Sequence, residues 1–240
     1  ESLNRVFFIF SFYGTLLRKI RRYFFMSNFL AILQENFKTL FSNPLTLITL
    51  IGCAILLIAL IKFKSLKFNS KLVTRIGLAI ALAFILDMIK IYTLPNGGGS
   101  ISLGSMIPIM LISFVYGPAI GLFTGFLFGV FKLIIDPYIL NPIQVLFDYP
   151  LPFMAVGVAG LFRNKYWGAT LGMLLRFVCH FISGVIFFGS YAPSGMSPII
   201  YSLAVNGLAV GGELLICLVL LAFLPVEQLI KILKSNISLT

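Results

Sequence analysis

Long apolar runs without charge are the feature that most constrains how this chain folds. The run from Pro44 to Ile61 holds no charged residue, and the whole chain is 60% hydrophobic and only 10% charged. A soluble domain usually has about 45–50% apolar and about 25% charged residues. The composition therefore excludes a soluble enzyme, a nucleic-acid-binding protein and a disordered chain. Because the apolar residues form runs instead of alternating, the pattern argues against an outer-membrane barrel and predicts an all-α, polytopic membrane helical bundle.

Seven runs approach the length of about 20 residues that a helix needs to cross a bilayer. The first run and the basic segment behind it predict an extra N-terminal transmembrane helix and loop over residues 44–71. The other six predict one domain over residues 72–240. The predicted spans are residues 44–61, 76–94, 101–116, 119–135, 144–162, 169–188 and 199–224.

The basic residues between the spans predict which side faces the cytoplasm. Lys and Arg gather at residues 62–75, 163–167 and 231–234, which the spans place on one side. The connectors at residues 95–100 and 190–198 hold no Lys or Arg and fall on the other side. Cytoplasmic loops of membrane proteins carry an excess of Lys and Arg. We therefore expect a multi-pass protein of the cell membrane with cytoplasmic basic loops, and the net charge of +11 fits contact with anionic lipid instead of nucleic acid.

Residues 1–43 form a basic segment that fits this scheme less well. The apolar run at residues 6–17 is too short to span, and four basic residues follow it at residues 18–22. If residues 44–61 span the membrane, that cluster lies on the outer side. Either residues 6–17 form an interfacial or partial span, or Met26 is the native start and the preceding stretch is not native.

Charged residues inside spans are informative because each costs about 2.5–3.5 kcal/mol at the bilayer centre and tends to face a cavity or a partner. Asp148 stands just before Pro150 and Pro152, which mark an irregular helix start. One interpretation is a buried carboxylate that meets a cationic or amine-bearing ligand. The other is an interfacial helix cap.

Arg176 and His180 lie four residues apart and therefore share a helix face, which Gly184 continues. His180 is either a functional group or a hydrogen bond between helices. Glu213 is deep in the last span and either pairs with Arg176 or lines a cavity. Tyr201 begins the same span. No metal site or cofactor is predicted, because the chain has a single His and its three Cys residues form no CxxC pair.

Small residues spaced four apart in the second span form the pairs Gly77/Ala81 and Ala79/Ala83. Such spacing lets helices approach closely, either within this chain or against another membrane subunit. The chain has no GxxxxGK[ST] phosphate loop, so it is not itself an ATPase.

Four stretches of the sequence, residues 102–114, 144–149, 180–198 and 201–206, resemble the thiamine-specific S-component family of energy-coupling factor transporters. The resemblance implies a six-helix S-component core with a substrate pocket near the outer face. It implies thiamine as ligand, and as partners a coupling transmembrane subunit and two cytoplasmic ATPase subunits. Energy for release would come from those partners.

The resemblance also implies roles for individual residues. The expected ligand-binding residues are Asp148, Tyr149, His180, Gly184, Phe188, Tyr201 and Asn206. The expected lid loop is residues 95–100, with Asn96, Gly97 and Gly98. The expected surface for the coupling subunit is Gly77, Ala79, Ala81 and Ala83.

The chain departs from the family at three places. Some members have Glu where Asp148 stands, Trp where Phe188 stands, and a Trp in the first outer loop. Asp shortens the reach of the carboxylate, and Phe weakens a cation–π contact, for which Trp is best. Two alternatives therefore stay open: another pyrimidine or cationic vitamin as ligand, and an intramembrane enzyme that uses Asp148 and His180 as an acid–base pair.

Overall fold

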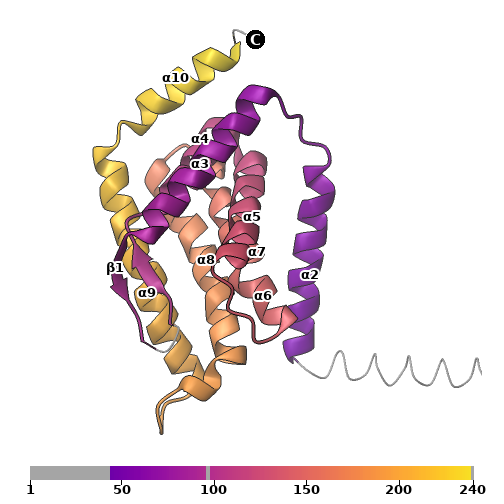
Figure 1. The fold of residues 1–240 in the computed structure, drawn as a ribbon, viewed down its shortest axis with the longest axis vertical. Coiled ribbons are helices and arrows are strands. Elements are labelled where there is room, and N and C mark those ends of the chain that lie inside the picture. The colour runs from indigo at the N-terminus through magenta and orange to yellow at the C-terminus, as the bar shows by residue number, and fades with distance from the viewer. Residues whose placement is uncertain (1–43, 96–97, 239–240) are drawn as a thin grey trace, which may run out of the picture. The chain divides into compact units, whose positions relative to one another are not determined.

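The computed structural model describes residues 44–95 and 98–238. The unit that begins at Gly52 is a bundle of helices with one short hairpin (Figure 1). The expectations for residues 1–43 and for Asn96 and Gly97 lie outside the described residues. The helices are α2 (Pro44–Phe63), α3 (Ser70–Met88), α4 (Ile107–Tyr116), α5 (Pro118–Ile135), α6 (Pro142–Asp148), α7 (Pro150–Val156), η1 (Gly157–Leu161), α8 (Lys165–Phe187), η2 (Gly189–Tyr191), α9 (Pro198–Phe223) and α10 (Val226–Ser238). The strands are β1 (Lys90–Thr93) and β2 (Ser100–Ser102).

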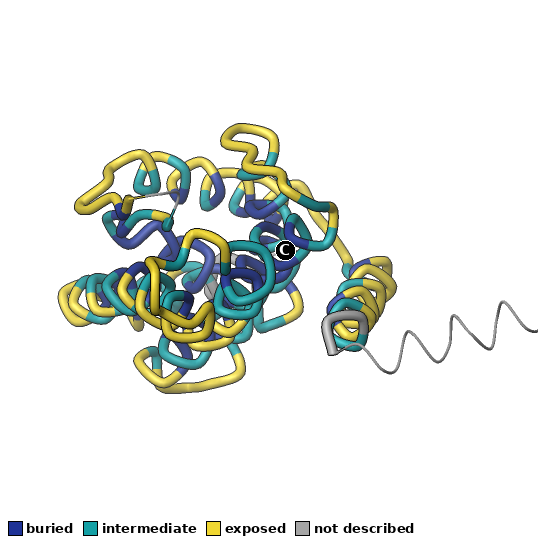
Figure 2. The backbone as a smooth tube through the Cα atoms, turned by 90° about the horizontal axis from the view of Figure 1, so that it is seen from below, coloured by how far each residue is buried: buried dark blue, intermediate teal, exposed yellow. Residues whose placement is uncertain are grey.

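The prediction of a helical membrane protein is confirmed. Four described segments are long and apolar enough to cross a membrane: Pro118–Ile135, Pro142–Leu161, Lys165–Phe187 and Pro198–Phe223. Large apolar side chains such as Leu78 on α3 and Leu215 on α9 are 66% exposed. Within the bundle, buried stretches lie inward and exposed ones outward (Figure 2). An apolar outer surface of this kind suits a lipid environment.

Helices α4 and α7 supply much of the interior. Ile109 and Met110 of α4 and Val156 of α7 have no exposed surface. Phe128 of α5 is also fully buried, with its ring centroid 4.5 Å from that of Phe84 and 4.9 Å from that of Phe153. These contacts join α3, α5 and α7, so the short helices that carry site residues rest on a packed core.

Three glycines of α5 allow that close packing. A Cβ at Gly121, Gly125 or Gly129 would collide with the backbone of Gly157, Phe153 or Tyr149, respectively. These small residues therefore serve contact within the chain, where the backbone of α5 approaches the backbone of residues 149–157.

A hairpin replaces the end of the second predicted span and the start of the third. The sequence predicted continuous spans over 76–94 and 101–116, but α3 ends at Met88 and α4 begins only at Ile107. Between them β1 pairs antiparallel with β2, with Tyr92 opposite Ile101. The β-branched and aromatic residues of β1 favour a strand, and their apolar character is what made the segment resemble a span.

The fifth predicted span is broken into α6, α7 and η1. Tyr149 has φ −121° and ψ −79°, which is not helical, and Pro150 and Pro152 follow it in the first turn of α7. Proline lacks a backbone N–H and is tolerated only in the first turn of a helix. The break predicted from these prolines therefore lies directly after Asp148.

Local caps fix where two helices near the site begin. Asn141 Oδ1 accepts a hydrogen bond from the Ile143 N–H at 2.8 Å at the start of α6. Ser197 Oγ accepts from the Ile200 N–H at 3.3 Å at the start of α9. In both helices the residue after the cap is Pro, whose fixed φ suits the first helical position.

Candidate functional site

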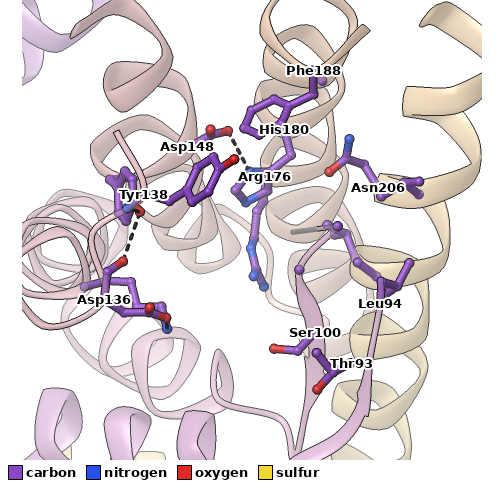
Figure 3. A pocket seen from close by; sticks show the side chains of 18 of the residues that line it. Thr93, Leu94, Ser100, Asp136, Tyr138, Asp148, Arg176, His180, Phe188 and Asn206 are labelled. Carbon is purple, nitrogen blue, oxygen red and sulfur yellow. Dashed lines mark hydrogen bonds and ion pairs between the residues drawn. The ribbon is translucent and has the colours of Figure 1, made fainter. Parts of the chain in front are cut away.

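A cavity of about 470 Å³ opens between the hairpin and helices α6, α7, α8 and α9. All the residues that the sequence predicted as ligand-binding line this cavity: Asp148, Tyr149, His180, Gly184, Phe188, Tyr201 and Asn206. From the expected lid loop, Gly98 lines it as well. Figure 3 shows the labelled side chains from α6, α8 and α9 converging on one space.

Asp148, at the end of α6, contacts His180 of α8 in the wall of the cavity. Its Oδ1 lies 3.4 Å from His180 Nδ1, and each side chain is 17% exposed. Its Oδ2 accepts a hydrogen bond from Gln144 Nε2 at 2.5 Å. A carboxylate offers about four lone-pair sites, so Asp148 keeps acceptor capacity for a further donor.

The other charges that line the cavity are balanced by partners. Lys132 Nζ lies 2.8 Å from Asp87 and 2.9 Å from Asp136. Lys90 lies 3.2 Å from the same Asp87. Asp87 thus joins both lysines in one group of ion pairs. Of the carboxylates among the described lining residues, only Asp148 has no Lys or Arg partner. Its partner is the imidazole ring of His180 instead, so no Lys or Arg competes with a cationic ligand for this carboxylate.

Arg176, which also lines the cavity, belongs to a buried ion pair. Its Nη1 lies 2.6 Å from Glu213 Oε2, and its Cζ lies 5.0 Å from the centre of the Phe153 ring. The first of the two interpretations of Glu213, pairing with Arg176, is confirmed. Glu213 Oε1 accepts hydrogen bonds from Ser102 at 2.5 Å and Ser105 at 2.7 Å. The pair thus joins α8 and α9 to the base of the hairpin.

Phe188 and Tyr138 form an aromatic part of the cavity wall. The Phe188 ring at the end of α8 stacks with Tyr138 at 5.8 Å and lies 6.0 Å from the Tyr191 ring. The Tyr138 and Tyr191 hydroxyls are 3.0 Å apart. This hydrogen bond raises the pKa of the Tyr138 phenol, which lies in the connector between α5 and α6. Stacked rings of this kind can face an organic cation.

Gly184 brings α8 and α9 together at the cavity. A Cβ at Gly184 would collide with Ser202 Oγ and come within 2.7 Å of Asn206 Nδ2. Asn206 Nδ2 donates to Ser202 Oγ at 3.1 Å, and Ser202 Oγ donates to the Phe181 carbonyl at 2.8 Å. Gly184 therefore sets the position of Asn206, whose side chain points into the cavity (Figure 3).

The hydroxyl of Tyr149 is engaged within the protein. It accepts a hydrogen bond from the Tyr138 N–H at 2.7 Å and donates to the Asp136 carbonyl at 3.0 Å. Tyr149 thus holds the connector between α5 and α6 against the cavity.

The four small residues expected to form a docking surface divide between two faces of α3. Ala83 is fully buried and Ala79 packs against the core. Gly77 and Ala81 are exposed, and a Cβ at Gly77 would meet nothing within 4 Å. Only Gly77 and Ala81 lie on the surface in this conformation.

Sequence reasoning did not single out Tyr138 or Gln144 as site residues. Tyr138 lies in a connector without periodicity, and Gln144 is an uncharged residue at a helix start. Gln144 is 1% exposed, which is unusual for a polar residue, but burial at a helix start does not follow from sequence pattern alone. Among the described residues no group of three or more His, Cys, Asp or Glu side chains is placed to hold a metal ion.

Comparison with known proteins gives a consistent result. Residues 73–233 match the family model described as thiamine transporter protein (Thia_YuaJ). The thiamine transporter ThiT of Bacillus subtilis strain 168 is 36% identical over 187 residues, covering 68% of this chain and 96% of that protein. The thiamine transporter ThiT of Lacticaseibacillus paracasei is 32% identical over 162 residues, covering 58% of this chain and 80% of that protein. A solved structure of ThiT from Listeria monocytogenes has a TM-score of 0.55 at 25% identity, covering 71% of this chain and 98% of that one.

Proposed function

The chain belongs to the thiamine transporter family, and on that premise we propose that it is the substrate-binding subunit that captures thiamine with high affinity for uptake. Because it belongs to this family, the chain is a multi-pass membrane transport protein and not an enzyme. The facing Asp148 and His180 side chains are accordingly parts of a binding site in this proposal, and the acid–base alternative falls away.

The observation that carries the proposal is the Asp148 carboxylate in the cavity wall, which is paired with His180 and with no Lys or Arg. Thiamine has a permanently cationic thiazolium ring and an aminopyrimidine ring. Among the described carboxylates that line the cavity, Asp148 alone lacks a Lys or Arg partner. Its carboxylate therefore favours binding of such a cation. The volume of about 470 Å³ also falls in the usual range of about 300–1,000 Å³ for small-molecule sites.

The geometry supports a role for each group. Asp148 accepts a charge-assisted hydrogen bond from the exocyclic amine of the pyrimidine. Phe188 presents its ring face to the thiazolium cation, with Tyr138 stacked beside it. The remaining polar edges of the ligand face His180, Tyr201 and Asn206, all of which line the cavity.

Capture and release are separate steps in this proposal. In it, the cavity faces the exterior, the basic loops lie in the cytoplasm, and the loop at residues 95–100 has the role of a lid. A coupling transmembrane subunit and two cytoplasmic ATPases supply the energy for release, since the sequence has no phosphate loop of its own. The exposed pair Gly77 and Ala81 on α3 is the proposed contact with the coupling subunit.

Calorimetry of the purified chain against thiamine and a panel of other pyrimidines and cationic vitamins tests the proposal. We expect saturable thiamine binding without ATP or partner subunits, tighter than for any other member of the panel. If another cationic vitamin bound more tightly, that vitamin and not thiamine would be the assigned ligand. Absence of thiamine binding would refute the proposed function.

A further inference from the structure

Gln144 lines the cavity and connects two parts of it through one buried amide. Its Nε2 donates hydrogen bonds to Asp148 Oδ2 at 2.5 Å and to the Tyr138 carbonyl at 3.1 Å. Its Oε1 accepts from the Leu140 N–H at 3.0 Å. A primary amide has two N–H donors and one carbonyl acceptor, so these contacts use both donors and the acceptor.

The orientation of this amide follows from its partners. A backbone N–H such as that of Leu140 can only donate, and a carbonyl such as that of Tyr138 can only accept. The oxygen of Gln144 must therefore face Leu140, and its nitrogen must face Asp148. His180 holds the other carboxylate oxygen at 3.4 Å. The carboxylate is thus fixed by α6 on one side and by α8 on the other.

We propose, on the basis of the proposed function, that Gln144 is a positioning residue that fixes the Asp148 carboxylate and residues 138–140 in their binding arrangement before the ligand arrives. The Tyr138 ring stacks on Phe188, so one amide organises both the negative charge and one side of the aromatic wall. When these groups are already ordered, binding of the ligand loses less conformational entropy, and the binding free energy is more favourable. Gln144 itself needs no contact with the ligand.

Substitutions of similar size test this role by calorimetry with thiamine. Gln144→Met keeps much of the volume but removes the hydrogen bonds, and we expect binding at least about 10-fold weaker. Gln144→Glu keeps the acceptor but places a second carboxylate beside Asp148, and we expect a larger loss. Thr124→Val is the matched control, because Thr124 is also fully buried and donates only to the Ile120 carbonyl of its own helix. It should stay within about twofold of the unchanged protein, and equal losses in Gln144→Met and Thr124→Val would overturn the proposal.

A double-mutant cycle separates positioning of Asp148 from a general structural role. If Gln144 acts through the carboxylate, Gln144→Met should weaken binding by less than about twofold in the Asp148→Asn background. If Gln144→Met weakened thiamine binding by the same factor with Asp148 and with Asn at that position, Gln144 would act on the fold and not on Asp148. That result would contradict the proposal.

A second readout needs no ligand. The chain contains a single histidine, so ¹⁵N-histidine labelling reports the His180 ring alone. We expect both Gln144→Met and Asp148→Asn to shift the ring-nitrogen resonances of the ligand-free protein, and Thr124→Val to leave them in place. Unchanged resonances in Gln144→Met would refute the positioning role. If the unchanged protein does not bind thiamine, the proposed function fails while this measurement still decides the role of Gln144.

Discussion

Replacing Asp148 by Asn removes a negative charge from the cavity and keeps the shape of the side chain. A hydrogen bond to a charged group contributes about 1.5–3 kcal/mol, against about 0.5–1.5 kcal/mol for a neutral one. The Asp148 side chain is 17% exposed, so its attraction to a cation is partly screened. For a thiazolium placed at a distance of about 8 Å, that attraction would be worth about 2 kcal/mol at an effective dielectric constant of about 20. A total loss of about 2–4 kcal/mol corresponds to thiamine binding weaker by about 30- to 1,000-fold.

Calorimetry of Asp148→Asn and of a matched variant, Asp136→Asn, tests this estimate. Asp136 lines the same cavity, but its side chain is 71% exposed and pairs with Lys132, which keeps Asp87 as a partner. We expect Asp136→Asn to stay within about threefold of the unchanged protein. An Asp148→Asn affinity within about threefold of the unchanged protein would refute the reasoning. Equal losses in both variants would show that only the overall charge matters.

Three further predictions concern other parts of the site. Gly184→Ala should weaken thiamine binding by at least about 10-fold in calorimetry, because the added Cβ displaces Asn206; an unchanged affinity would remove Asn206 from the site. Gly77→Leu should leave thiamine binding unchanged but lower thiamine uptake by cells that contain the coupling module, and normal uptake would exclude this face of α3 as the docking surface. Glu213→Gln should lower the free energy of unfolding by about 3–5 kcal/mol, since it leaves Arg176 buried without its anion, and a thermal melt unchanged from that of Asp136→Asn would contradict this.

The sequence predicts the bundle and much of the site because the bilayer restricts both. Backbone groups in hydrocarbon must be paired within the chain, so long apolar runs become helices. Charges are costly there, so Asp148, Arg176 and Glu213 stood out as residues that face a partner or a cavity. Two of them do pair, and the third lines the cavity. The prolines after Asp148 similarly marked the break between α6 and α7.

The remaining features depend on contacts between distant segments. Residues 90–93 are apolar enough to continue a helix, and they form a strand because residues 100–102 are available to pair with them. Gln144 becomes a site residue only because α6 turns its amide toward Tyr138 and Asp148. Ser102 and Ser105 gain their role from Glu213, more than 100 residues away in the chain. The periodicity of a single sequence does not show which distant segments come into contact.

A structure of the chain with thiamine bound tests the central claim most directly. The account predicts thiamine in the cavity, with its exocyclic amine within hydrogen-bonding distance of the Asp148 carboxylate and its thiazolium facing the Phe188 ring. Thiamine bound elsewhere, or in this cavity with its amine directed away from Asp148, would contradict the account.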